Sequence, residues 1–234
     1  MPILFALPTH EYMVKPLMQT ANFTLGEFTL KRFPNDELHV ALHIPVKKYN
    51  CIVLGTIAPP EINLFSFLLL CHTLKKEKAG RITAVLPYLA YSRHDKNEPQ
   101  KSYALALIAQ LFVGAGITEI ITVDIHSLHT KRLFPMPLIS LSPAKIFANE
   151  IIKLSMQSAT IVAPDKGAIN RCKAVDKFAG IKREIAYMEK KRTEQGVIHS
   201  ILHGKVSKRV IIVNEQCSKP CLLQYFSNKI ITWG

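Results

Sequence analysis

Short apolar runs rich in β-branched residues alternate with longer stretches that carry apolar residues at helical spacing. Runs of this kind are typical of buried strands, and here they occupy residues 3–7, 51–56, 81–86, 119–123, 160–163 and 210–213. The stretches with helical spacing occupy residues 61–78, 102–115, 143–154 and 167–179. Strands that alternate with helices predict an α/β fold, with parallel sheets covered by helices on both faces.

The alternation occurs in two blocks, separated at residues 135–142. We therefore expect two domains, residues 1–140 and 141–234, each a doubly wound parallel sheet. A chain of 234 residues with 48% hydrophobic residues can fill both cores. In such sheets the ligand groups lie just past the carboxyl ends of the strands, so the search for a site starts there.

The charge balance points to an anionic partner. The 30 lysines and arginines outnumber the 17 acidic residues, which gives a net charge of +13. Because the basic residues are spread over the chain and form no stripe, a nucleic acid is the less favoured partner. The five scattered cysteines are typical of buried thiols in a reducing compartment. The longest apolar run, residues 64–70, is too short to cross a bilayer, and residues 1–12 lack a signal-peptide pattern, so we expect a cytoplasmic protein without a membrane partner.

A cationic segment follows the expected strand 81–86. Residues 87–96 read PYLAYSRHDK, so Arg93, His94 and Lys96 stand beside two tyrosines at a strand end. Cations of this kind bind phosphate, and aromatic rings stack on a base. A solvated basic turn explains the same residues, and the segment by itself does not decide between the two interpretations.

A carboxylate and an imidazole follow the expected strand 119–123. Asp124 and His126 stand there in the sequence VDIHSLH, and His129 is a further candidate at the start of a short helix. This pair suits a complex of metal and phosphate. The alternative is a structural histidine, which is the commoner role for a single histidine at a strand end.

Two further segments lie in the second block. In VAPDKGA, Asp165 follows the expected strand 160–163, where it can reach a magnesium ion or a ribose hydroxyl, or simply cap the next helix. The polar segment 188–194, MEKKRTE, carries cations that a mobile loop can close over a phosphoryl group. A solvated turn is the alternative for this second segment.

These four segments, in this order and together with RFPNDE at residues 32–37, resemble ribose-phosphate diphosphokinase, also called phosphoribosyl pyrophosphate synthetase. The archaeal-type branch of the family is the most similar. The resemblance runs from about residue 4 to residue 213. It implies two phosphoribosyltransferase-like domains and an enzyme that transfers the diphosphoryl group of Mg–ATP to the C1 hydroxyl of ribose 5-phosphate. Members of the family form homo-oligomers, so a dimer or a hexamer of dimers is expected.

The resemblance also implies roles for individual residues. Phe33, Asn35 and Glu37 match the adenine-binding segment, which the family typically offers to a neighbouring subunit, and Arg93 and His94 match the Arg-Gln pair that holds ATP. The histidine at position 94 departs from the usual glutamine. The metal-binding positions are matched by His126 and Asp165, with Mg²⁺ as the cofactor. The cationic pair of the catalytic flexible loop is matched by Lys190 and Arg192.

The pattern breaks after the expected strand 210–213. The family's sugar-phosphate loop has two aspartates followed by a Thr-Gly-Gly-Thr turn, whereas this chain reads NEQCSKPCL at residues 214–222. Asn214 and Glu215 stand at the two carboxylate positions. Pro220 has no N–H to offer a phosphate, and the glycines are missing. We expect a degenerate sugar site, an incomplete second domain and impaired turnover. The alternative function is a non-catalytic, nucleotide-binding regulatory partner of a complete synthetase.

Overall fold

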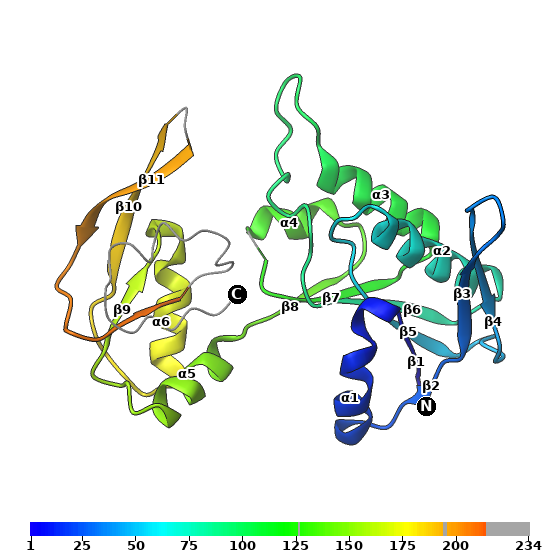
Figure 1. Ribbon diagram of the computed structural model, residues 1–234, viewed down its shortest axis with the longest axis horizontal. Helices are drawn as coiled ribbons and strands as arrows, with labels where there is room; N and C mark the ends of the chain where they lie inside the picture. Colours follow the sequence, from blue (N-terminus) through cyan, green and yellow to red (C-terminus); the bar gives the residue numbers. More distant parts are fainter. Residues whose placement is uncertain (126, 194–195, 214–234) are drawn as a thin grey trace. The chain divides into compact units, whose positions relative to one another are not determined.

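The computed structural model of the chain describes residues 1–125, 127–193 and 196–213. It divides into two compact units, Met1–Leu141 and Ser142–Gly234, which we call the first and the second unit and describe separately (Figure 1). The division lies one residue from the domain boundary expected above.

The first unit is built on a six-stranded sheet with the strand order β2, β1, β5, β6, β7, β8. All five pairs of neighbouring strands are parallel. The strands of this sheet are β1 (Ile3–Ala6), β2 (Thr24–Leu25), β5 (Asn50–Leu54), β6 (Arg81–Leu86), β7 (Glu119–Val123) and β8 (Leu138–Leu141). The expected α/β class with a parallel sheet is confirmed.

Helices cover both faces of this sheet, as the alternation along β1 requires. Ile3, Phe5 and Leu7 belong to the core that also contains the buried residues of α2 and α3. Leu4 and Ala6 belong to a smaller core against η1 and α1. The helical segments of the unit are η1 (Pro8–Met13), α1 (Val14–Thr20), α2 (Ile62–Lys76), α3 (Ala104–Ala115) and α4 (Leu128–Leu133).

Two strands of the first unit were not expected from the sequence as a separate hairpin. β3 (Phe28–Arg32) and β4 (Leu38–Leu42) pair with each other in an antiparallel, two-stranded sheet. Its inner residues, Phe28, Leu30 and Leu42 among them, pack against the main core. β8 lies inside residues 135–142, where we expected only a connection, because Leu138 and its neighbours find their partners on β7.

The second unit has a four-stranded sheet with the order β11, β10, β9, β12. β9 is parallel to both β10 and β12, and β10 is antiparallel to β11. Its elements are α5 (Ala144–Lys153), β9 (Thr160–Ala163), η2 (Lys166–Ala168), α6 (Ile169–Phe178), β10 (Ala186–Thr193), β11 (Gly196–His203) and β12 (Val210–Ile212).

The segment predicted as a mobile loop, 188–194, is mostly strand. Residues 188–193 belong to β10, and β10 and β11 form a hairpin that projects beyond the rest of the unit (Figure 1). The prediction of a loop was wrong because it considered only a mobile loop or a solvated turn for this charged segment. Cross-strand pairing with β11 satisfies their backbone groups instead. Among the described helices, none combines the length and the apolar character needed to cross a membrane.

Candidate functional site

The parallel strands β6 and β7 bring two of the predicted motifs to the same edge of the first sheet. The two strands are neighbours, with Leu86 in register with Thr122 near their carboxyl ends. The segment 87–103 therefore starts beside Asp124, and it extends away from the sheet before α3 begins (Figure 1). Parallel pairing thus places the cationic motif and the aspartate–histidine motif next to each other.

A short hydrogen bond joins these two motifs. The Ser127 hydroxyl donates to Oδ2 of Asp95 over 2.5 Å, and Asp95 is only 3% exposed. Ser127 stands at the N-cap position of α4, but its side chain makes no capping hydrogen bond. A buried carboxylate is costly unless it is hydrogen-bonded, so this contact holds the two loops in one arrangement.

Arg93 and His94 lie on the exposed side of the loop that Asp95 anchors. The His94 N–H donates to the Tyr91 carbonyl over 2.8 Å, and the two rings meet edge to face at 6.5 Å. Tyr91 has a φ of 63°, a left-handed conformation that turns the chain sharply at this point. The loop thus exposes the Arg93 and His94 side chains to solvent, while Asp95 anchors it.

The predicted metal-binding motif is only partly described. Asp124 follows β7 with a φ of 53°, and its Oδ1 accepts a hydrogen bond from the Ile125 N–H over 3.0 Å. His126 lies outside the described residues, while His129 is exposed on α4. The aspartate therefore stands at the carboxyl end of the strand, as predicted.

The hairpin β3–β4 carries Phe33, Asn35 and Glu37 at its tip. The tip is closed by hydrogen bonds from the Phe33 N–H to the Glu37 carbonyl, 2.8 Å, and from the Asp36 N–H to the Phe33 carbonyl, 2.9 Å. In this chain the hairpin lies apart from the β6–α3 loop, so the structure does not bring these three residues to Arg93 and His94 (Figure 1).

Asp165 stands at the end of β9 in the second unit and caps the following turn. Its Oδ1 accepts a hydrogen bond from the Ala168 N–H over 3.1 Å, which is the capping alternative considered above. Next to it, the Lys166 Nζ lies 5.7 Å from the centre of the Tyr187 ring. Tyr187 in turn stacks on His203 at 4.7 Å, so the Asp165 turn contacts the base of the β10–β11 hairpin.

The predicted catalytic cations lie on β10. In the antiparallel ladder Lys190 pairs with His199 and Arg192 with Val197, and the register shifts between Glu189 and Lys190. The backbone of the two cations is thus part of a hairpin and not of a loop. Asn214 and Glu215 lie outside the described residues.

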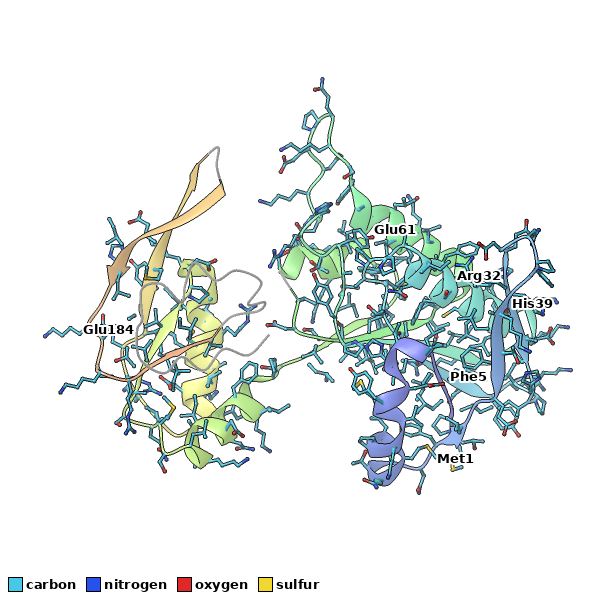
Figure 2. All side chains as sticks on the ribbon, viewed as in Figure 1. Met1, Phe5, Arg32, His39, Glu61 and Glu184 are labelled. Atoms are coloured by element: carbon cyan, nitrogen blue, oxygen red, sulfur yellow. The ribbon has the colours of Figure 1, made fainter. Side chains whose placement is uncertain are left out.

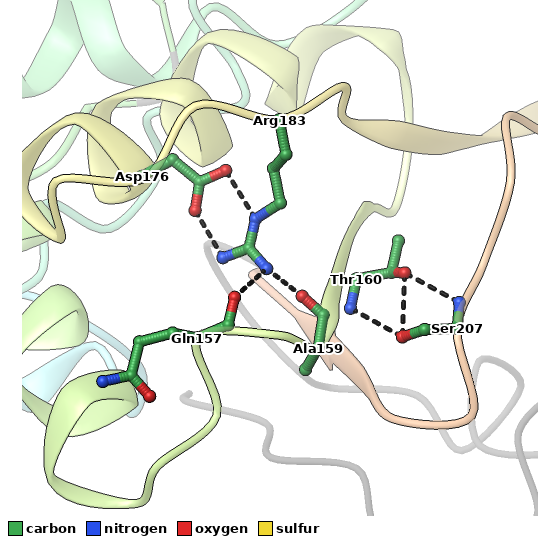
Figure 3. A network of polar contacts seen from close by, with 6 residues as sticks. All are labelled: Gln157, Ala159, Thr160, Asp176, Arg183 and Ser207. Carbon is green, nitrogen blue, oxygen red and sulfur yellow. Dashed lines mark hydrogen bonds and ion pairs between the residues drawn. The ribbon is translucent and has the colours of Figure 1, made fainter.

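A network of polar contacts connects the start of β9 with the segment that leads into β10 (Figure 3). Arg183 binds the Asp176 carboxylate through two hydrogen bonds of 2.8 and 2.6 Å and donates to the carbonyls of Gln157 and Ala159. The Thr160 and Ser207 hydroxyls are 3.0 Å apart. Sequence reasoning missed this network, although an acid and an arginine seven residues apart were visible in the sequence.

The comparisons with known proteins agree with this picture of the first unit. Residues 2–116 match the model of the N-terminal domain of ribose phosphate pyrophosphokinase. These residues therefore form an N-terminal domain of the ribose-phosphate pyrophosphokinase type. The ribose-phosphate pyrophosphokinase of Cereibacter sphaeroides is 30% identical over 201 residues, which are 83% of this chain and 59% of that protein. That of Campylobacter jejuni is 29% identical over 213 residues, which are 90% of this chain and 66% of that protein.

A fold like that of a solved synthetase extends over both units of the chain. The crystal structure of phosphoribosylpyrophosphate synthetase from Mycobacterium smegmatis superposes with a TM-score of 0.83 at 23% identity, covering 99% of this chain and 80% of that one. At this identity the likeness shows the fold alone. The chain spans between 59% and 66% of the length of the two pyrophosphokinase relatives above.

Proposed function

We propose that this chain is a member of the ribose-phosphate pyrophosphokinase family and acts as a ribose-phosphate diphosphokinase whose turnover is impaired at the sugar site. The C1 hydroxyl of ribose 5-phosphate would attack the β-phosphorus of ATP, losing its proton, while the bond to the α-phosphate breaks and AMP leaves. The observation that carries the proposal is the Asp95–Ser127 hydrogen bond, which holds two motifs suited to phosphate at one sheet edge of the first unit. Residues 2–116 of this unit match the family's N-terminal domain.

In this proposal Arg93 and His94 hold the phosphates of ATP from the anchored loop. Both side chains are exposed, and charge-assisted hydrogen bonds from a cation to phosphate are strong. Phe33, Asn35 and Glu37 bind the adenine of a neighbouring subunit, which is consistent with the distance of the hairpin from the β6–α3 loop in one chain (Figure 1).

The residues present suit Mg²⁺. Within the described ranges no group of three or more His, Cys, Asp or Glu side chains could hold a metal by itself. Magnesium in kinases needs only one or two protein carboxylates, because nucleotide phosphates supply the other oxygens. Asp165 supplies one such carboxylate in the second unit. His126, which matches a separate metal position of the family, lies outside the described residues. When bound, the ion would offset the charge on the phosphate oxygens.

Lys190 and Arg192 supply further positive charge to the transferring group. Diphosphoryl transfer needs alignment and charge compensation more than a protein nucleophile. A projecting hairpin is a suitable carrier for such cations, since it reaches beyond the body of the second unit.

The sugar-phosphate site is the part of the proposed active site that departs most from the family's pattern. Asn214 and Glu215 retain polar atoms for a ribose diol, but Pro220 removes one N–H from the segment that would wrap the 5-phosphate. Lost backbone donors weaken binding of ribose 5-phosphate more than that of ATP, so we expect ATP binding without full turnover.

Calorimetry on the 234-residue chain tests the nucleotide half of the proposal. Mg–ATP is expected to bind saturably, and Arg93→Ala to weaken binding by about 10- to 100-fold, since it removes a charge-assisted contact. Lys76→Ala serves as the control, because it removes an equal charge from the C-terminal end of α2, near the opposite edge of the sheet. Equal affinities of both variants and the unaltered chain would contradict the assignment.

Release of AMP that depends on ribose 5-phosphate tests the reaction. Slow but steady release supports an impaired diphosphokinase. ATP binding without any such release would instead favour a nucleotide-binding regulatory partner of a complete synthetase.

A further inference from the structure

The outer face of the β3–β4 hairpin gathers a lysine and two aromatic rings. Lys31 is in register with His39, and Phe33 follows Lys31 by two residues, so all three side chains stand on one side of the hairpin. The opposite side, with Leu30 and Val40, packs into the core. Lys31, Phe33 and His39 are exposed, and Figure 2 shows His39 on the hairpin at the periphery of the first unit, away from the interior position of Phe5.

Phe33 and His39 contact each other through their rings. The ring centres are 5.0 Å apart with the planes tilted by 38°. Phe33 is still 48% exposed. Within the described part of the chain, His39 is the aromatic residue whose ring contacts Phe33. The ring is therefore supported by one neighbour and leaves the remainder of its surface open for a planar ligand.

The backbone of Phe33 is held independently of its ring. Its N–H and carbonyl both take part in the hydrogen bonds that close the hairpin tip, and Arg32 contacts Asp36 across the same turn. The tip fixes where the Phe33 side chain begins, and His39 restricts where the ring can go. A ring that is already ordered loses less conformational entropy when a base stacks on it.

We propose that His39 is a positioning residue for adenine recognition, because it holds the Phe33 ring ready to stack on the base. This inference rests on the proposed function, in which Phe33 binds adenine. Position 39 acts through Phe33 and touches no reacting atom. Its effect should be confined to ligands that carry a base.

Calorimetry with two ligands tests the inference on the full chain. His39→Ala is expected to weaken Mg–ATP binding by about three- to tenfold, the range of an aromatic pair energy. His39→Phe keeps a ring at this position and is expected to restore affinity to within about twofold of the unaltered chain. Magnesium tripolyphosphate, which has no base, should bind the unaltered chain and His39→Ala equally well.

His43→Ala is the matched control. His43 is an exposed histidine of the hairpin, next to β4, and its Nε2 is 2.5 Å from the Thr29 hydroxyl. Its replacement should leave Mg–ATP affinity unchanged. Thermal midpoints of all variants, measured by circular dichroism, check that the unit is folded.

The possible outcomes distinguish the role of His39 from the proposed function on which it rests. If Phe33→Ala weakens Mg–ATP binding while His39→Ala does not, the role of His39 is wrong and the proposed function stands. If His39→Ala weakens ATP and tripolyphosphate alike, His39 acts on the unit as a whole and the inference is overturned. No binding of Mg–ATP by the unaltered chain would overturn both.

Discussion

At the scale of single residues, the Ser127 side chain stabilises the candidate site and does not cap the helix that it precedes. An N-cap serine commonly accepts a hydrogen bond from the helix backbone, yet this hydroxyl donates to Asp95. The contact crosses from the β7 end to the loop after β6, and it leaves the first turn of α4 without a side-chain cap.

Ser127→Ala is expected to lower the free energy of unfolding by about 1–3 kcal/mol, because the buried Asp95 carboxylate loses a hydrogen-bond donor. The same variant should weaken Mg–ATP binding by loosening the loop of Arg93. Urea denaturation and calorimetry measure the two effects. Ser158→Ala, which alters an exposed serine outside this contact, is the control, and equal stability of both variants would contradict the assigned role.

The buried cysteines are expected to be inert and to make stability depend on pH. Burial raises the pKa of Cys51 to about 11 and that of Cys172 to about 12, and it raises the pKa of Cys71 as well. The folded chain therefore keeps these thiols neutral where the unfolded chain ionises them, above the ordinary pKa of 9.0. The free energy of unfolding should fall as the pH rises above that value.

Alkylation with iodoacetamide, followed by peptide mass spectrometry, checks this expectation. Cys51, Cys71 and Cys172 should react slowly at pH 8 in the native chain and rapidly in urea, because the thiolate is the reactive form. Rapid labelling of any of the three in the native chain would show that its burial is wrong.

At the scale of elements, the second unit depends on the Arg183 network as much as on its apolar core. Arg183 joins Asp176 on α6 to the Gln157 and Ala159 carbonyls before β9 (Figure 3). The side chains of Asp176 and Arg183 are 5% and 16% exposed. This ion pair ties the end of α6 to the start of β9, at whose other end Asp165 stands.

Arg183→Ala is expected to destabilise the second unit by about 3–5 kcal/mol, because it leaves the buried Asp176 charge unpaired. Lys101→Ala is the comparison, since it breaks an ion pair with Glu98 at the surface. The Lys101 side chain is 71% exposed and the Glu98 side chain is 48% exposed. Such surface pairs contribute only about 0–1 kcal/mol. Chemical denaturation of both variants measures the difference, and similar losses would contradict the ranking.

At the scale of the whole molecule, the chain exposes apolar surface that points to self-association. On α3 the exposed fractions of Leu107, Leu111 and Val113 are 56%, 38% and 49%. Leu107 and Leu111 are four residues apart and share one face of the helix. We expect a patch of this kind to contact another copy of the chain, which is the homo-oligomer that the family resemblance predicts.

Leu107→Lys is therefore expected to shift the chain toward monomer. Burying one leucine contributes about 1.5–3 kcal/mol, and a lysine at the same place opposes the contact. Analytical ultracentrifugation over a range of concentrations measures the change. Leu107→Met keeps the apolar area and should assemble like the unaltered chain, whereas equal assembly of the lysine variant would place the interface elsewhere.

The parallel strands of the two sheets were largely predictable. The apolar runs at 81–86, 119–123 and 160–163 match β6, β7 and β9, because a strand buried on both faces needs a continuous apolar run. The polar hairpins were not predictable in the same way. β10 carries several charges, and its strand conformation comes from pairing with β11, a partner that composition does not reveal.

The sequence by itself determined the fold class, the resemblance to the family and the positions of Asp124 and Asp165 at strand ends, because burial patterns and motifs are local properties of a chain. Only the tertiary structure decided that Ser127 reaches Asp95, that His39 supports Phe33 and that Arg183 joins α6 to β9. Hydrogen bonds and ring contacts act over a few ångströms, so they depend on which segments the sheets bring side by side.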